Sequence, residues 1–226
     1  MTPISSIGEL VLYKNNQFIA FNKPPAIPSQ SDKTGDVSLL ELAERYAQHP
    51  LHLVHRIDRP ASGVVLLAKN KKALTAVQRQ FQARQTQKIY LAVVPNLPEP
   101  PQATLTHFLK KDGRKNKALV QTDDKSGGKE ARLTYEHIGS SDRYHLLKIT
   151  LQTGRFHQIR AQLAAVNNPI KGDVKYGFRR SNSDRSIQLH AWQLRFTHPI
   201  SGVRETIIAP PPQSAIWDAF DLSEGE

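Results

Sequence analysis

Asp58 stands between two arginines in the stretch His55-Arg56-Ile57-Asp58-Arg59-Pro60-Ala61-Ser62-Gly63. A nearby positive charge favours the ionised form of a carboxyl group, so we expect this aspartate to be charged. An ionised aspartate can act as a nucleophile, as a general base or as a metal ligand. The same residues also fit a salt bridge at a surface turn, and the rest of the chain has to decide between the two interpretations.

The sequence after Asp58 indicates a loop that leads into a buried strand. The apolar run Val64-Val65-Leu66-Leu67-Ala68 is short and β-branched at its start, which predicts a core strand. Catalytic side chains tend to lie on loops that such rigid elements hold in place. The position of Asp58 is therefore one where a reactive carboxylate is expected.

A second dense stretch, Thr153-Gly154-Arg155-Phe156-His157-Gln158-Ile159-Arg160, ends a predicted strand and begins a helix over 156–166. The apolar residues of this helix recur at helical spacing and predict one buried stripe. Arg160 falls roughly 80° from the centre of that stripe at about 100° per residue, so its guanidinium can reach inward. A half-buried arginine needs an acceptor, and Asp58 is the natural candidate. His157 is expected to point toward solvent.

Tyr90 and a basic segment are further candidates for binding. The run Lys88–Val94 predicts a strand, in which Tyr90 is either an ordinary half-buried tyrosine or an aromatic side chain that stacks on a base. The segment Lys110-Lys111-Asp112-Gly113-Arg114-Lys115-Asn116-Lys117 is basic and contains a glycine. It is either a solvated hairpin tip or an arm that binds phosphate groups.

The composition points to a polyanionic partner. The 226 residues include 31 Lys and Arg against 20 Asp and Glu, so the formal net charge is +11. An excess of positive charge of this size favours binding to nucleic acid. The chain contains no cysteine, which excludes disulfides, a thiolate nucleophile and cysteine-ligated metal sites. Neither a signal peptide nor an apolar run of membrane-spanning length is found, so we expect a soluble cytoplasmic protein.

The expected elements are mostly strands, with helices near 38–47, 71–84 and 156–166. Ser38 and Glu41 fit a capping box, and Asn70 can cap the second helix. A last short helix is expected from Ser214, with Trp217 and Phe220 docked on the core. Paired strands are expected at 10–13 with 18–21, 132–138 with 144–151, and 189–196 with 205–209. We expect one domain over residues 1–226.

Together these stretches resemble the sequence pattern of RluA-type RNA pseudouridine synthases. The stretch from His55 to Gly63, followed by Val-Val-Leu-Leu-Ala-Lys, resembles the signature of that family. Its other blocks also appear in order, over about residues 10–210. These are Asn22-Lys23-Pro24, Lys88-Ile89-Tyr90-Leu91-Ala92, Gly154-Arg155-Phe156-His157-Gln158-Ile159-Arg160, Gly172-Asp173 with Tyr176-Gly177, and Leu189-His190-Ala191-Trp192 with Phe196-Thr197-His198-Pro199.

The chain departs from the family pattern at two positions of the signature. Ile57 stands where the family usually has leucine, which is a conservative change. Ala61 stands where the family usually has threonine, which puts one local hydrogen bond in doubt but not the reaction. We expect the small RNA-binding domain that many relatives carry ahead of the catalytic domain to have no room here, and substrate binding to come from the catalytic domain and its basic loops.

The resemblance implies an α+β fold with a mixed, mostly antiparallel sheet in two halves, and with flanking helices and loops around a central active-site cleft. It implies an isomerase that converts uridine in ribosomal or transfer RNA to pseudouridine. The reaction needs neither a cofactor nor a metal. We expect a monomer whose partner is RNA.

The resemblance also assigns roles to residues. Asp58 would be the catalytic carboxylate, Arg160 would pair with it, and Tyr90 would pack against the uracil of a base flipped out of the RNA. Arg56 would assist the extrusion of that base, which costs a few kcal/mol. A set of basic, polar and turn residues is expected to contact the substrate. They are Arg56, Arg59, Ser62, Gly63, Lys110, Lys111, Arg114, Lys115, Arg155, His157 and Gln158.

Two other functions remain open from the residues alone. A non-catalytic RNA-binding module would explain the net charge and Tyr90, but it has no need for Asp58. A metal-dependent hydrolase would use His52, His55 and Asp58 as ligands, although the neighbouring arginines oppose a cation. A retaining glycosidase does not fit, because no second carboxylate is suitably placed.

Overall fold

The computed structural model describes residues 6–121, 123 and 127–222. These residues fall into two compact units. The first unit comprises the chain up to Lys88 together with His190–Pro211, and the second comprises Ile89–Leu189 together with the chain from Pro212. Each unit is therefore built from segments that lie far apart in the sequence.

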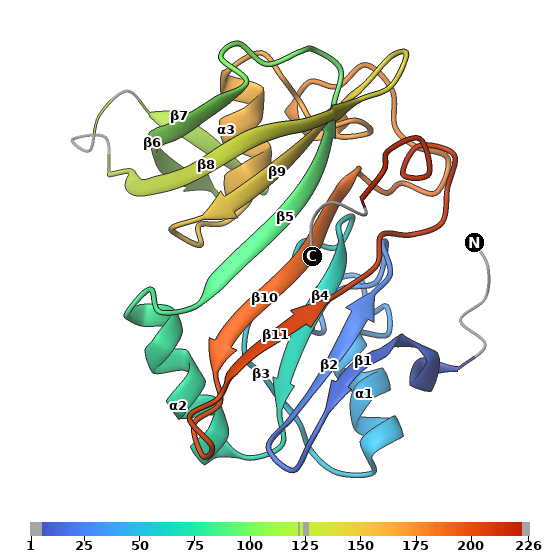
Figure 1. The fold of residues 1–226 in the computed structure, drawn as a ribbon, viewed down its shortest axis with the longest axis vertical. Helices are drawn as coiled ribbons and strands as arrows, with labels where there is room; N and C mark the ends of the chain where they lie inside the picture. Colours follow the sequence, from blue (N-terminus) through green and yellow to red (C-terminus); the bar gives the residue numbers. More distant parts are fainter. Residues whose placement is uncertain (1–5, 122, 124–126, 223–226) are drawn as a thin grey trace. The chain divides into compact units, whose positions relative to one another are not determined.

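The first unit contains a sheet and two α-helices, α1 (Leu39–Ala47) and α2 (Lys71–Gln82), which Figure 1 labels. The strands β1 (Val11–Lys14), β2 (Phe18–Lys23), β4 (Ser62–Ala68) and β10 (Leu189–Thr197) are neighbours in this order. The short β3 (His52–Leu53) pairs with β4, and β11 (Arg204–Ile208) pairs with β10. These pairs are antiparallel except β4 with β10, which is parallel. A 3-10 helix, η1 (Ile7–Leu10), precedes β1.

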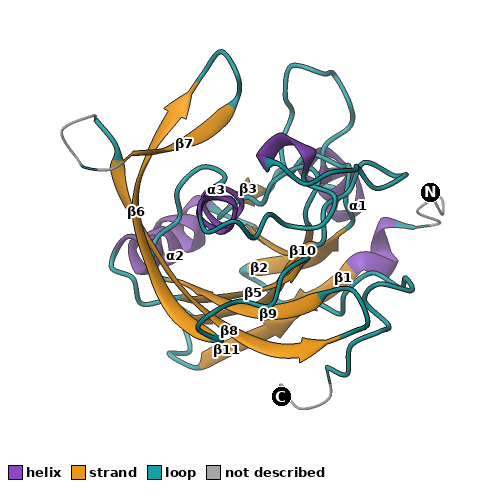
Figure 2. Ribbon diagram, turned by 90° about the horizontal axis from the view of Figure 1, so that it is seen from above, coloured by secondary structure: helices purple, strands orange, loops and turns teal. Residues whose placement is uncertain are grey.

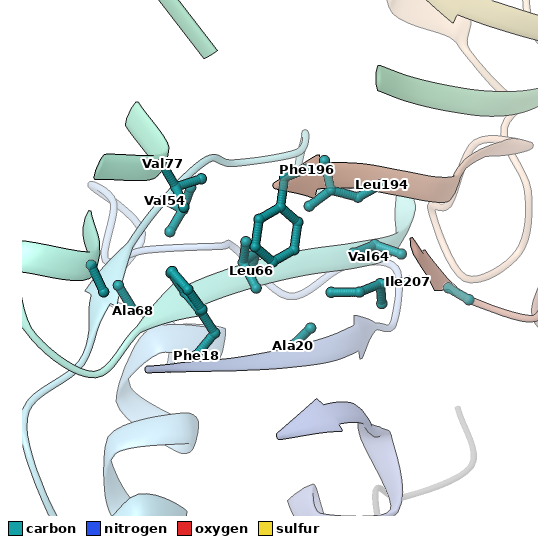
Figure 3. Close-up of a cluster of buried hydrophobic side chains, with 12 residues drawn as sticks. Phe18, Ala20, Val54, Val64, Leu66, Ala68, Val77, Leu194, Phe196 and Ile207 are labelled. Atoms are coloured by element: carbon teal, nitrogen blue, oxygen red, sulfur yellow. The ribbon is translucent and has the colours of Figure 1, made fainter. Parts of the chain in front are cut away.

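The core of the first unit lies between the sheet and α2 (Lys71–Gln82), and Figure 3 shows its side chains. Phe18 of β2 and Phe196 of β10 meet edge to face, with ring centroids 5.4 Å apart. All residues of β4 are buried, which explains its continuous apolar sequence. Helix α1 (Leu39–Ala47) covers the other face, where Tyr46 contacts Phe21. Burial of each large apolar side chain stabilises this core by roughly 1.5–3 kcal/mol.

The second unit contains a curved sheet and one α-helix. Its strand order is β5 (Gln87–Val94), β9 (His145–Leu151), β8 (Lys129–Ser140), β6 (Gln102–Asp112) and β7 (Lys117–Gln121). The β6–β8, β6–β7 and β8–β9 pairs are antiparallel. Helix α3 (Gln158–Ala165) packs against β6 and β7, and the β6–β7 hairpin curls up beside it in Figure 2. A 3-10 helix, η2 (Val174–Tyr176), follows α3.

The predicted fold class is confirmed, because the strands form a mixed, mostly antiparallel arrangement divided between two units with flanking helices. The capping box is also confirmed: the Ser38 hydroxyl accepts from the Glu41 N–H, and the Glu41 carboxylate accepts from the Ser38 N–H. Asn70 caps α2 as expected. Over the described ranges, every helix is too short or too polar to cross a membrane.

The helix predicted from Ser214 is wrong. Residues 214–220 form successive turns, with a hydrogen bond of 2.9 Å from the Asp218 N–H to the Ser214 carbonyl. Trp217 and Phe220 are nevertheless buried, as expected. A segment this short forms too few helical hydrogen bonds to offset the entropy of ordering it, so side-chain docking decides its conformation.

Candidate active site

Asp58 is half-buried on the loop between β3 and β4, and hydrogen bonds fix the backbone on both sides of it. The Ile57 carbonyl accepts from the Ser29 hydroxyl at 3.0 Å, and the Ile57 N–H donates to the same hydroxyl at 3.3 Å. The Asp58 carbonyl accepts from the Ala61 N–H at 3.1 Å, which closes a turn. The carboxylate therefore projects from a backbone with little freedom to rotate.

Lys23 holds the next carbonyl of the same loop. Its side chain is fully buried, and its ammonium nitrogen donates to the carbonyls of Pro24 and Ile27 at 2.8 Å each and of Arg59 at 3.2 Å. Desolvation lowers the pKa of Lys23 to about 7, an effect that the Asp58 charge opposes and the Arg59 charge assists. Three acceptors match the three N–H bonds of an ammonium group, so this geometry fits the protonated form. The end of β2 thereby supports the loop that carries Asp58.

His55 anchors the start of the loop to β4. Its Nε2 accepts from the Leu66 N–H at 3.2 Å, and its ring stacks on Phe81 with centroids 5.6 Å apart. Desolvation, with a smaller effect from the Lys88 charge, lowers the pKa of His55 to about 3, so the ring is neutral. A nitrogen that accepts a backbone hydrogen bond is not placed as a metal ligand. Among the residues that the structure describes, no group of three or more His, Asp and Glu side chains could hold a metal ion.

The two arginines beside Asp58 have different surroundings. Arg56 is exposed, whereas Arg59 is bound by a surface loop. Its guanidinium donates to Asp36 at 2.8 Å, to Thr34 at 2.7 Å and to Asp32 at 3.4 Å. Hydrogen bonds from Thr34, aided by the Arg59 charge, hold the pKa values of both carboxyl groups below their usual range. Contact of either arginine with substrate stays a prediction.

Ser62 and Gly63 were expected to contact substrate, and the structure instead buries both in the sheet. The Ser62 hydroxyl lies 2.8 Å from His190 Nδ1, and His190 Nε2 lies 2.9 Å from the Ala209 carbonyl. Because a carbonyl only accepts, Nε2 carries the proton and Nδ1 accepts from the serine. Desolvation lowers the pKa of His190 to about 4. These residues join β4 to β10, so we assign them to the scaffold.

Gly63 allows β4 and β10 to approach closely. Its φ is +114°, and a Cβ at this position would lie 2.2 Å from the Ala191 carbonyl oxygen. No side chain fits such a gap, and an L-residue rarely adopts this φ. The glycine of the signature therefore allows β4 and β10 to pair closely, directly after the Asp58 loop.

In the second unit, Arg160 of α3 forms a buried ion pair with Asp173, a residue to which the sequence analysis gave no role. Arg160 Nε lies 2.7 Å from Asp173 Oδ2, and Nη2 lies 2.9 Å from Oδ1. The two side chains are only 5% and 1% exposed. The sequence predicts that the Arg160 guanidinium needs a carboxylate, and the structure supplies Asp173 as one. A guanidinium has five N–H donors, so this pair is compatible with a second acceptor, and the predicted pairing with Asp58 stays a prediction.

Tyr176 connects η2 with α3 and β7. Its hydroxyl accepts from the Ala118 N–H at 2.7 Å and lies 2.9 Å from His157 Nδ1. Its ring lies beneath two cations, the Arg160 guanidinium at 5.1 Å and the Lys117 ammonium at 4.8 Å. The predicted solvent exposure of His157 is thus only partly correct, because its ring is held by Tyr176 and stacks on the preceding phenylalanine.

Helix α3 differs from the predicted amphipathic helix. It begins at Gln158, two residues later than expected, because His157 adopts a left-handed φ of +51°. Residues 158–163 are all buried, so no solvated face exists over these turns. Gln158 was expected to contact substrate, but its amide oxygen accepts from the Thr153 hydroxyl and the Arg155 N–H, and its amide nitrogen donates to the Arg132 carbonyl. We therefore assign Gln158 to the scaffold.

The basic segment forms the tip of the β6–β7 hairpin, where Lys117 is half-buried and the other four cationic side chains are exposed. Asp112 shapes the tip by accepting from the N–H groups of Arg114 at 2.9 Å and Lys115 at 3.0 Å. Lys111 lies 4.7 Å above the Phe156 ring, and Lys110 is its exposed neighbour in β6. Arg155 Nε donates to the Glu130 carbonyl. Binding of substrate by the four hairpin cations and Arg155 stays a prediction.

Tyr90 lies in β5 with 9% of its surface exposed, and the residues from 89 to 94 around it are buried as well. The strand is buried on both faces rather than alternating between core and solvent. Its position fits an ordinary core tyrosine, and stacking on a base stays a prediction.

Comparison with known proteins gives one family match and many relatives. Residues 17–165, which include Asp58, Tyr90 and Arg160, match the family described as RNA pseudouridylate synthase. An uncharacterized RNA pseudouridine synthase of Mycoplasma pneumoniae is 34% identical over 193 residues, which are 84% of this chain and 62% of that protein. The ribosomal large subunit pseudouridine synthase C of Buchnera aphidicola is 32% identical over 90% of this chain and 67% of its own length. The solved structure of human RNA pseudouridylate synthase domain containing 1 shares the fold, with a TM-score of 0.77, 24% identity and coverage of 92% and 86% of the two chains.

Proposed function

Because the chain belongs to the RNA pseudouridylate synthase family, we propose that it isomerises uridine in ribosomal or transfer RNA to pseudouridine, with Asp58 as the catalytic carboxylate. One observation carries the proposal: the family match includes a half-buried aspartate on a loop whose backbone is hydrogen-bonded on both sides. A surface salt bridge would not need a loop fixed in this way. Fixed geometry is what a catalytic group requires.

The reaction balances without any other reagent. The bond between N1 of uracil and C1′ of the ribose breaks, the base rotates, and a bond forms between C5 and C1′. The proton on C5 is lost and N1 gains one, so no oxidant, reductant or energy source is consumed. A carboxylate suits this chemistry, since it can attack carbon or remove a proton.

Arg160 and Tyr90 complete the proposed site. Arg160 would pair with Asp58 while Asp173 holds the opposite part of its guanidinium. An ion pair at about 4 Å and an effective dielectric near 20 is worth about 4 kcal/mol before desolvation is subtracted. Tyr90 would pack against the flipped uracil, and Arg56, exposed beside Asp58, would help to extrude it.

The RNA partner is proposed from charge as well as from the family. The exposed cations of the hairpin tip, with Arg155, would contact phosphate groups. Arg59 would join them if it leaves the acidic loop. We further propose that the protein is cytoplasmic, because its RNA substrate lies in the cytoplasm. It needs no cofactor, because the isomerisation is balanced by itself. We also propose that it acts as a monomer.

The test is to incubate the purified protein with total RNA from a strain that lacks its gene, and to map pseudouridine at nucleotide resolution. We expect new pseudouridine at one or a few uridines, in the presence of a chelator, and none with Asp58→Asn. Asp58→Asn should still bind the RNA. If the wild type leaves every uridine unchanged, the proposed isomerase is wrong, and RNA binding without modification would identify a non-catalytic binding module.

A further inference from the structure

We propose that Ser29 is a positioning residue for the catalytic aspartate, and that its hydroxyl sets the orientation of the peptide between Ile57 and Asp58. This inference rests on the proposed function of Asp58. It adds to the site a residue from another segment of the chain, which lies outside every sequence block that the family resemblance uses.

The first support is the double hydrogen bond of the Ser29 hydroxyl. It donates to the Ile57 carbonyl at 3.0 Å and accepts from the Ile57 N–H at 3.3 Å, and both bonds are buried. A strand in an antiparallel ladder offers the same pair of bonds to the residue opposite it. The Ser29 hydroxyl thus gives Ile57 the two hydrogen bonds that a neighbouring strand would otherwise supply.

The second support is that Ser29 is itself held in place. It is 4% exposed, and its backbone is hydrogen-bonded to the first turn of α1, which begins further along the chain at Leu39. The Leu39 N–H donates to the Pro28 carbonyl at 2.8 Å, and the Leu40 N–H donates to the Ser29 carbonyl at 3.3 Å. The first N–H groups of a helix have no partners within it, so these bonds use donors that α1 has available. Helix α1 therefore supports Ser29, which supports the loop.

The geometric consequence falls on Asp58. Rotation of the Ile57–Asp58 peptide about its two flanking bonds swings the Cα–Cβ bond of the aspartate. The Ser29 hydroxyl opposes that rotation through its bond to the Ile57 carbonyl, and its bond from the Ile57 N–H holds the preceding peptide. Lys23 and the turn at Ala61 hold the backbone after Asp58 but make no bond to Ile57. A misplacement of about 1 Å can reduce a catalytic rate by about 100-fold, so loss of this one hydroxyl should appear in the chemical step.

The experiment compares Ser29→Thr with Ser29→Val. Threonine and valine have nearly the same shape, so the pair separates the hydroxyl from steric effects at this buried site. We expect the single-turnover rate at saturating enzyme to be at least about tenfold lower for Ser29→Val than for Ser29→Thr, with equal affinity for RNA. Rates are normalised to the folded fraction, so that reduced stability alone does not register. Ser31→Thr and Ser31→Val serve as the matched control, because Ser31 is exposed and its hydroxyl donates to Glu41 at 3.2 Å.

A second measurement does not depend on activity. The Ile57 amide proton should exchange with solvent faster in Ser29→Val than in Ser29→Thr, because it loses its acceptor. Equal rates in the two variants, or an equal loss of rate and of RNA affinity, would overturn the positioning role. If the wild type forms no pseudouridine, the proposed function fails instead. In that case the exchange of Ile57 still decides whether Ser29 holds the loop.

Discussion

Asp173 supplies the buried guanidinium of Arg160 with a counter-charge inside the second unit. Its carboxylate contacts Arg160 through both oxygens, and the two side chains are almost inaccessible to solvent. Removal of one partner from such a pair leaves an uncompensated charge, which typically costs about 3–5 kcal/mol. The net value of the pair is smaller, because both charges were desolvated to form it.

We therefore expect Asp173→Asn to lower the free energy of unfolding by about 3 kcal/mol or more. The change keeps the size of the side chain, so the loss reports the charge. Urea unfolding of wild type and variant measures it, and Asp142→Asn, at an exposed position, is the control. A loss below about 1 kcal/mol, the range of exposed pairs, would contradict a tightly coupled buried pair.

His190 gives the first unit a sensitivity to acid. The folded protein keeps this ring neutral down to about pH 4, because desolvation lowers its pKa. In the unfolded chain a histidine takes up a proton near pH 6.5. Between these values the unfolded state binds more protons, so the free energy of unfolding should fall as the pH falls through this range, by up to about 1.4 kcal/mol per pH unit.

His190→Gln should reduce the dependence of the unfolding free energy on pH by an amount that corresponds to at most one proton, because the other titrating groups are unchanged. Urea unfolding of both proteins at several pH values between 4 and 6.5 measures the difference. Identical slopes would mean that His190 titrates normally in the folded protein.

At the scale of single residues, the sequence predicted the position of Asp58 on a loop but not the partners of the site residues. The loop position of Asp58 follows from the buried strand that comes after it. Asp173 could not be chosen from the sequence, because its partner is set by where η2 lies against α3. The family resemblance places Ser62 and Gln158 at the substrate, and it carries no information on their partners within this chain. Their actual partners, His190 and the Arg132 carbonyl, come from distant parts of the chain.

At the scale of elements, the parallel contact between β4 and β10 depends on one glycine. Ala191 faces Gly63 across this pair, and its backbone fills the space that a side chain at position 63 would need. The clash is with backbone atoms, so no rotamer change can relieve it. The two strands would have to separate where the core of the first unit is formed.

Gly63→Ala should therefore reduce the melting temperature strongly or prevent folding. Two effects act at this position, the positive φ and the clash. Gly202→Ala isolates the first, since Gly202 has a φ of +71° and open space where its Cβ would lie. Backbone strain of this kind costs about 1–3 kcal/mol, so Gly63→Ala should lose clearly more than Gly202→Ala in thermal unfolding. Equal losses would show that the strands can move apart easily.

The elements that the sequence predicted best have local signals. Ser38 with Glu41 and Asn70 define the starts of α1 and α2, because a cap acts on residues only two or three positions away. Helix α3 differs from the predicted amphipathic helix because residues 158–163 are all buried, and its two glutamines donate to carbonyls of β8 instead of facing solvent. The turns at 214–220 were misread because capping signals alone do not stabilise so short a helix.

At the scale of the whole molecule, the net charge of +11 should govern the affinity for RNA. Binding to phosphates releases condensed counterions, so the logarithm of the association constant should fall linearly with the logarithm of the salt concentration. The exposed tip of the β6–β7 hairpin is where we expect part of this effect. The sequence shows the cations of this segment. It does not show that Phe156 and Tyr176 lie beside two of them.

We expect the double variant Arg114→Gln with Lys115→Gln to reduce the salt slope of RNA binding by about 1.4, at about 0.7 for each lost contact to a single strand. The double variant Lys71→Gln with Lys72→Gln removes the same charge from α2 and should change the slope less. Binding titrations at several salt concentrations measure both. Equal changes would mean that net charge alone matters and that the hairpin has no special role.

The backbone carbonyl groups around Asp58 are all hydrogen-bonded, and this affects which changes in sequence can alter the choice of substrate during evolution. The carbonyl groups of residues 57–59 are occupied by donors from the protein itself, which leaves outward side chains such as Arg56 as the loop's readable surface. Replacing that side chain changes what an approaching nucleotide meets while the backbone behind it stays fixed. A duplicated gene can thus change how the loop meets a nucleotide at one outward position and inherit the backbone that carries Asp58 unaltered.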